Sequence, residues 1–262
     1  GDICDFFLCK ARIEDALPIF TVLTIPATGS EMNQGCVITN EAAKQKFSAA
    51  SPRLFPRVSI LDPGTTITLP AAQVANGGVD ALAHLIEGYF STTDTDVTIT
   101  DELVHAIARS VITGTDRILA DRGDYDARAS MMWSATLALN GLQTPGYGRI
   151  SFANHAIEHS LSALYDIAHG AGLAIVMPAW FKYHLKKDGP GRLKKFGAAV
   201  FGARTAEATI KTFEDWFRKI GAPIRLSEAG IPAPDIPKIA GNAMGLVRRW
   251  GMDYDRKTVE RI

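Results

Sequence analysis

The sequence predicts two parts, an α/β segment over residues 1–70 and an all-helical segment over residues 71–262. Two observations predict this division. Before Pro70, short runs rich in β-branched and aromatic residues alternate with turn clusters, whereas after it apolar residues recur at the spacing of a helix face. Glycine and proline clusters mark breaks within the helical part, at residues 123–124, 141–148, 188–191 and 221–223.

The α/β segment is predicted from three apolar runs, Phe20–Ile25, Cys36–Thr39 and Val58–Leu61. Turn-forming residues at 27–30 and 62–64 bound them. About 70 residues are too few for a complete nucleotide-binding domain, which usually needs two βαβ halves. We therefore expect this part to be incomplete at its front.

The helical segment is predicted from apolar residues that recur every three or four positions. Three such faces are formed by Leu82, Leu85, Ile86 and Tyr89, by Leu103, Ile107, Val111 and Ile112, and by Met132, Ala135, Thr136 and Leu139.

Composition predicts a folded protein with a small-molecule partner. Of 262 residues, 47% are hydrophobic, and 28 Lys and Arg balance 28 Asp and Glu, so there is no basic excess for nucleic acid or an anionic membrane. The longest apolar run, Gly170–Phe181, is shorter than the roughly 18 residues of a membrane-spanning helix. Three cysteines, Cys4, Cys9 and Cys36, fit reduced thiols. We expect a cytoplasmic protein without nucleic-acid or membrane partners.

Asp80 and His84 form the first chemically informative pair. Gly77 and Gly78 are predicted to end a loop and Asp80 to begin a helix, so that Asp80 and His84 lie one turn apart on one face. The alternative is an acidic residue that favours the helix dipole beside a packed histidine.

A second cluster follows in an apolar helical stretch. His155 and His159 are spaced one helical turn apart, and His169 follows after a break at residues 165–166. Together with Asp80 and His84, these imidazoles offer a donor set suited to Fe²⁺, Zn²⁺, Co²⁺ or Mn²⁺. Without a metal, each buried imidazole would need its own hydrogen-bonding partners.

Residues His155–His159 also spell H-x-x-E-H, in which two histidines bind zinc and the glutamate activates water. This pattern supports a zinc hydrolase as an alternative. It requires a further ligand downstream and gives Asp80, His84 and His169 no role.

Several segments together carry a family resemblance. They are Thr24–Asn33, Leu61–Pro63, Leu69–Ala81 with His84, Met131–Thr136, His155–Gly170 and Lys219–Pro223 with Leu226–Glu228. In combination they resemble the iron-containing (group III) alcohol dehydrogenases, most closely the butanol dehydrogenase-like NAD(P)H-dependent branch.

The resemblance implies a dehydroquinate synthase-like fold, with an N-terminal α/β dinucleotide-binding domain over residues 1–70 and an all-α metal-binding domain over residues 71–262. The family's G-G-G-S phosphate loop and its first βαβ unit are not found before Leu17. The dinucleotide-binding domain is therefore expected to be incomplete, either because the chain is shortened or because its front is not ordered.

The family's metal ligands, one aspartate and three histidines, fall on Asp80, His84, His155 and His169. His159 belongs to the same motif without being a ligand. The resemblance places it near the substrate and the nicotinamide, where it is expected to relay a proton.

Cofactor contacts are implied at Thr24, Thr28, Asn33, Lys46 and Leu69. Each has an ordinary structural alternative, because Thr-Gly-Ser is a common turn, a surface lysine is usually solvated, and a leucine packs in cores.

The resemblance implies reversible hydride transfer between NAD(P)H and a small aldehyde or primary alcohol, with Fe²⁺ or Zn²⁺ and a homodimeric state. A zinc metallohydrolase and an inactive helical scaffold remain alternatives. Glycerol dehydrogenases and dehydroquinate synthases share the fold, but one aspartate with three histidines favours the alcohol dehydrogenase branch.

Overall fold

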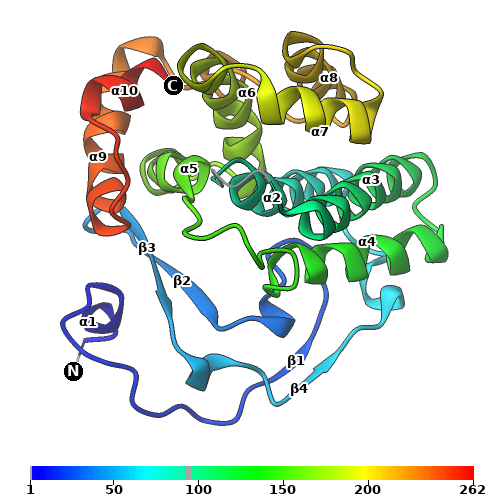
Figure 1. The fold of residues 1–262 in the computed structure, drawn as a ribbon. Coiled ribbons are helices and arrows are strands. Elements are labelled where there is room, and N and C mark those ends of the chain that lie inside the picture. The colour runs from blue at the N-terminus through cyan, green and yellow to red at the C-terminus, as the bar shows by residue number, and fades with distance from the viewer. Residues whose placement is uncertain (1, 92–95) are drawn as a thin grey trace.

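The computed structural model describes residues 2–91 and 96–262, and its strands lie along one side of a group of packed helices (Figure 1). The strands are β1 (Phe20–Val22), β2 (Gly35–Asn40), β3 (Gln45–Ala50) and β4 (Val58–Ile60), preceded by the short helix α1 (Cys4–Phe7). The remaining helices are α2 (Ala71–Ser91), α3 (Thr98–Ala120), α4 (Tyr125–Leu139), α5 (Ala153–Tyr165), α6 (His169–Asp188), α7 (Gly191–Phe201), α8 (Ala206–Lys219), α9 (Ile236–Arg249) and α10 (Arg256–Arg261). Single 3-10 turns occur at Ser30–Met32, Pro52–Leu54, Pro63–Thr66, Leu226–Ala229 and Ala233–Asp235.

The four strands form two separate pairs. β1 pairs in parallel with β4, with Phe20 opposite Val58, whereas β2 and β3 form an antiparallel hairpin with Gly35 opposite Ala50. Strands are confirmed within all three predicted runs, although β1 ends at Val22, before the predicted Ile25. The sequence analysis did not predict β3, because its Gln-Lys-Phe-Ser-Ala-Ala sequence has little of the β-branched pattern that marks a strand.

The parallel pair leaves large apolar side chains in contact with solvent. Phe20 is 68% exposed, and Val22, Val58 and Ile60 are each more than half exposed. Parallel sheets are normally covered on both faces. This pair therefore presents an apolar surface that the described residues do not cover.

Helix α2 runs through the centre of the helical part and packs against α3, α4 and α6. The prediction that Gly77 and Gly78 end a loop and that Asp80 begins a helix was wrong, because α2 already begins at Ala71. These glycines serve close packing instead. A Cβ atom on Gly77 would collide with the carbonyl oxygen of Pro26, and one on Gly78 would lie 3.1 Å from Thr115 Cγ2.

The predicted apolar faces of the first three long helices are largely confirmed. Leu82, Leu85, Ile86 and Tyr89 are fully buried. Leu103 is an exception at 36% exposed, because the buried stripe of α3 passes through its neighbour Val104.

The predicted breaks between helices are confirmed at each position. The break after α5 matters most for the site. α5 ends at Tyr165 because Asp166 adopts the left-handed conformation, with φ 54°, and α6 then begins at His169. The turn brings His169 back beside α5. Within the described residues, none of the helices has the length and apolar character needed to cross a membrane.

Candidate metal centre

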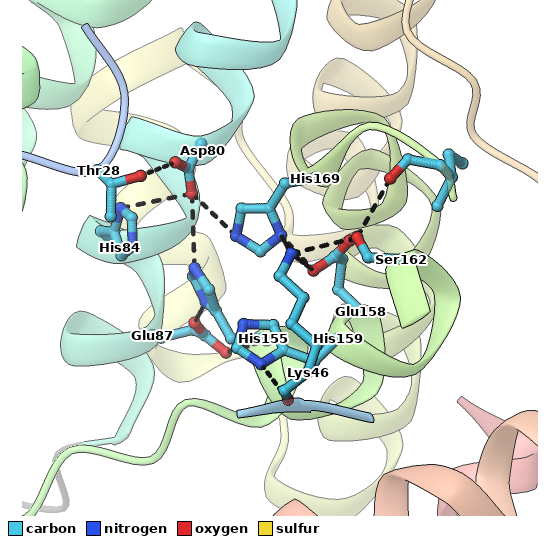
Figure 2. Close-up of polar contacts among 11 residues, drawn as sticks. Thr28, Lys46, Asp80, His84, Glu87, His155, Glu158, His159, Ser162 and His169 are labelled. Atoms are coloured by element: carbon cyan, nitrogen blue, oxygen red, sulfur yellow. Dashed lines mark hydrogen bonds and ion pairs between the residues drawn. The ribbon is translucent and has the colours of Figure 1, made fainter. Parts of the chain in front are cut away.

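One carboxylate oxygen, Oδ1 of Asp80, forms the centre of a histidine cluster (Figure 2). It lies 3.6 Å from His84 Nδ1, 3.5 Å from His155 Nε2 and 3.5 Å from His169 Nε2. α2 supplies Asp80 and His84, while α5 and the first residue of α6 supply the other two. Ligand atoms of Asp80, His155 and His169 all lie within 4.8 Å of one another. His84 stands beside this group with its ring stacked on that of His155, 4.5 Å between centroids.

Three atoms of this cluster are buried and lack a hydrogen-bond partner among the described residues. They are Asp80 Oδ1, His84 Nδ1 and His155 Nε2. Buried polar atoms are nearly always paired, so three unpaired ones facing a shared point need an explanation. A divalent cation accounts for them, because imidazole nitrogens and a carboxylate oxygen form a common donor set for zinc and iron. The residues present therefore fit a metal.

Two further carboxylates hold the other ring nitrogens of two of these histidines. Glu87 is fully buried on α2, and its Oε2 accepts from His155 Nδ1. Glu158 on α5 is also fully buried, and its Oε2 accepts from His169 Nδ1. Carboxylates in this position orient metal-binding histidines and raise their basicity.

Lys46 reaches into the cluster from β3. Its Nζ lies 3.2 Å from Ser162 Oγ, 3.2 Å from His169 Nδ1 and 3.6 Å from Glu158 Oε2. Because Glu158 already accepts the proton of His169 Nδ1, the ammonium group interacts with the carboxylate and the serine hydroxyl. Lys46 therefore joins the hairpin of β2 and β3 to the histidine cluster.

His159 lies in the same region, but it is not one of the histidines whose nitrogens face Asp80 Oδ1. Its Nδ1 donates to the backbone carbonyl of Lys46 at 3.2 Å, which leaves Nε2 without a proton in the neutral ring. Ligand atoms of Glu158, His159 and His169 also lie within 4.8 Å of one another. The ammonium group of Lys46 beside them opposes a second cation there.

The protonation of the cluster follows from burial and from neighbouring charges. Burial alone would raise the pKa of Asp80, but the surrounding His84, His169 and His155 rings hold it well below its usual range. Burial lowers the pKa of His84 to about 3. Burial would also lower the pKa of His155, but the carboxylates of Glu87 and Asp80 raise it to about 10. For His159, burial and then the charge of Lys46 bring the pKa well below its ordinary value.

The predicted cofactor residues lie in different settings. Thr28 Oγ1 donates to Asp80 Oδ2 at 2.8 Å, and Asn33 Nδ2 donates to the Thr28 carbonyl at 2.9 Å. Thr24 is exposed in the loop after β1. Leu69 is half-buried and packs against the helical core. The structure thus brings Thr28 and Lys46 into contact with the Asp80 and histidine cluster, while Thr24 and Leu69 lie in other surroundings.

Sequence analysis did not identify Glu87, although a signal was present. Glu87 follows Asp80 by seven residues and His84 by three, which places all three on one face of α2. Ser162 was also missed, and its hydroxyl donates to Glu158.

The arrangement does not support the H-x-x-E-H hydrolase. The histidine nitrogens that lie within 4 Å of Asp80 Oδ1 belong to His84, His155 and His169, and His159 is not among them in the described contacts. Glu158, which would have to activate water, is engaged with His169 and Ser162.

Two models of one protein family match the chain. The model described as Fe-containing alcohol dehydrogenase family, C-terminal, matches residues 74–261, and the model described as iron-containing alcohol dehydrogenase matches residues 3–63. The family likeness thus extends in front of Thr24, where the first of the resembling segments begins.

Two curated relatives are similar over most of the chain. The probable NADH-dependent butanol dehydrogenase 1 of Bacillus subtilis is 38% identical over 252 residues, which cover 93% of this chain and 64% of the relative. The NADH-dependent butanol dehydrogenase B of Clostridium acetobutylicum is 38% identical over 264 residues, which cover 95% of this chain and 67% of the relative. The chain thus spans about two thirds of the length of these relatives.

A solved structure shows the same arrangement of elements. The crystal structure of NADH-dependent butanol dehydrogenase A from Thermotoga maritima superposes with a TM-score of 0.94 and 45% sequence identity. The match covers 100% of this chain and 69% of that one.

Proposed function

Since the chain belongs to the iron-containing alcohol dehydrogenase family, we propose that it serves as a metal-dependent alcohol dehydrogenase or aldehyde reductase. The reaction is reversible hydride transfer between NAD(P)H and a small aldehyde or primary alcohol. One observation carries the proposal: the unpaired, buried Oδ1 of Asp80 faces His155 Nε2 and His169 Nε2, each 3.5 Å away. The names of the relatives, both butanol dehydrogenases, support the substrate class.

The proposed ligands of a divalent iron or zinc ion are Asp80, His84, His155 and His169. A metal of this kind supplies a Lewis acid that favours the alkoxide form of an alcohol and polarises a carbonyl group. Thr28 supports this role of Asp80, because its hydroxyl occupies Oδ2 and leaves Oδ1 to face the histidines.

His159 is the proposed proton-transfer residue. Burial keeps its ring neutral near pH 7, and the Lys46 carbonyl holds the proton on Nδ1, so that Nε2 can accept one. Its ring lies 5.6 Å from that of His169, which is near enough for the two to share a substrate.

For the fold, we propose that residues 1–70 are part of an α/β dinucleotide-binding domain and that residues 71–262 form the metal-binding domain, in a dehydroquinate synthase-like arrangement. The exposed apolar side chains of β1 and β4 support this, since a parallel sheet in such a domain is covered on both faces. Thr24, Thr28, Asn33, Lys46 and Leu69 are the proposed cofactor contacts. We also propose a homodimer, which sedimentation velocity would test.

The test is oxidation of NADH or NADPH with butanal, followed at the absorbance band of the reduced nicotinamide. Turnover should stop when a chelator removes the metal and should return when Fe²⁺ or Zn²⁺ is added. The metal content before and after treatment is measured by mass spectrometry. Turnover that persists in metal-free protein would contradict the proposal.

A further inference from the structure

Glu87 occupies an unusual position for a fully buried carboxylate, because no arginine or lysine pairs with it among the contacts of the described residues. Its partners are the ring of His155 and two backbone amides. It lies on the same face of α2 as Asp80 and His84. A buried negative charge that is satisfied by one ring and two amides fixes the relative positions of all these groups.

The two amides belong to the first turn of α5. Oε1 of Glu87 accepts from the backbone N–H of Asn154 and, at 3.2 Å, from that of His155. The residue that precedes this helix, Phe152, has no polar side chain to cap it. Glu87 therefore caps α5 from another helix, where a negative charge is also favoured by the helix dipole.

The same carboxylate determines which nitrogen of His155 carries the proton. A carboxylate only accepts hydrogen bonds, so its contact with Nδ1 requires the proton to be there. A metal binds the neutral form of the ring, and in that form Nε2 keeps the lone pair that faces Asp80 Oδ1. Glu158 makes the equivalent contact with Nδ1 of His169, whose Nε2 also faces Asp80 Oδ1.

We propose that Glu87 and Glu158 are positioning residues that hold the rings of His155 and His169 with Nε2 presented to the metal. The inference rests on the proposed function, because it takes the cluster to be a metal site. In this proposal Glu158 orients His169. Glu87 orients His155 and also joins the metal site to the first turn of α5.

The decisive substitutions are Glu87→Gln, which keeps size and shape, and Glu158→Met, which removes both oxygens that accept from His169 and Ser162. A glutamine has one accepting oxygen, and at residue 87 the amides of α5 occupy it. The amide –NH₂ group then faces Nδ1 of His155, makes that nitrogen an acceptor and shifts the proton to Nε2. Loss of such a partner typically lowers metal affinity by about 10- to 100-fold.

The measurement is the Kd of the full chain for Zn²⁺, in competition with a chromophoric chelator. Glu102→Gln is the matched control, because Glu102 also faces a histidine, with its Oε1 3.4 Å from His105 Nδ1, but on α3. We expect weaker zinc binding in each of the two variants and an unchanged Kd in the control. The absorption spectrum of the Co²⁺-loaded protein should also change in the variants, which a purely structural role would not cause.

Zinc affinity and Co²⁺ spectra equal to those of the wild type in both variants would overturn the inference and leave the proposed function intact. If Glu87→Gln does not fold because the cap of α5 is lost, Glu158→Met decides the matter, since Glu158 caps no helix in the described contacts. A wild-type chain that binds no metal would overturn both proposals, and the butanal assay reports on the proposed function separately.

Discussion

Thr28 Oγ1 donates a 2.8 Å hydrogen bond to Oδ2 of Asp80, across 52 residues of sequence. The bond joins the loop after β1 to the central helix α2. It leaves Oδ1, the oxygen that faces the histidines, as the unpaired atom of that carboxylate.

Thr28→Val keeps the side-chain shape but removes this donor. We expect zinc affinity to fall by about tenfold, because the carboxylate of Asp80 loses the partner that orients it. Thr28→Ser retains a hydroxyl and should behave like the wild type. A competition assay with a chelator measures both, and equal affinity in the valine variant would show that the bond does not position Asp80.

His155→Ala and His169→Ala should abolish metal binding and turnover together. Each removes a nitrogen that faces Asp80 Oδ1 at 3.5 Å. His159→Ala should keep the metal and lower kcat by about 10²- to 10⁴-fold, the usual contribution of a proton-transfer group. Metal analysis alongside steady-state rates distinguishes the two outcomes. A metal-free His159 variant would make His159 a ligand.

Gly170→Ala should destabilise the protein because α6 begins in direct contact with α2. A Cβ atom at residue 170 would lie 2.6 Å from the carbonyl carbon of Asn76. We expect a loss of about 1–3 kcal/mol in the free energy of unfolding, with weaker metal binding as His169 moves away from Asp80. Gly191→Ala is the control, because a Cβ atom there meets nothing within 4 Å. Urea denaturation measures both variants.

Asp101→Asn should remove a pH-dependent contribution to stability. Asp101 is fully buried and accepts from Arg192 at 2.7 Å, from Lys195 at 2.6 Å and from Tyr147 at 2.8 Å. Burial would raise the pKa of its carboxyl, but these donors lower it. The stabilisation is therefore present above the unfolded pKa of about 3.9 and is lost as the pH falls through the lower folded value.

At neutral pH the asparagine variant should be less stable by about 3 kcal/mol, as is typical when one partner of a buried ion pair is removed. The difference from the wild type should shrink as the solution is acidified. Unfolding curves recorded at several pH values measure it. A difference that stays constant down to acid pH would show that the charge of Asp101 is not its source.

Much of the fold was predictable from local pattern. Apolar periodicity located the faces of α2 and α4, and glycine and proline clusters located the ends of the helices. The start of α2 was not predictable in this way. Gly77 and Gly78 have the sequence of a loop, but they lie within α2, where glycine is needed because the Pro26 carbonyl and the Thr115 side chain leave no room for a Cβ atom.

The candidate metal centre was likewise predictable only in part. The residue types and the helical spacing of Asp80 with His84 and of His155 with His159 can be read from the sequence alone, because they depend on neighbours within one helix. Tertiary structure decided which nitrogen of each ring faces Asp80, and it brought Glu87 to His155 and Lys46 to Glu158. These contacts join different elements of the fold, and their geometry depends on how α2, α5, α6 and β3 pack together, which no local sequence pattern encodes.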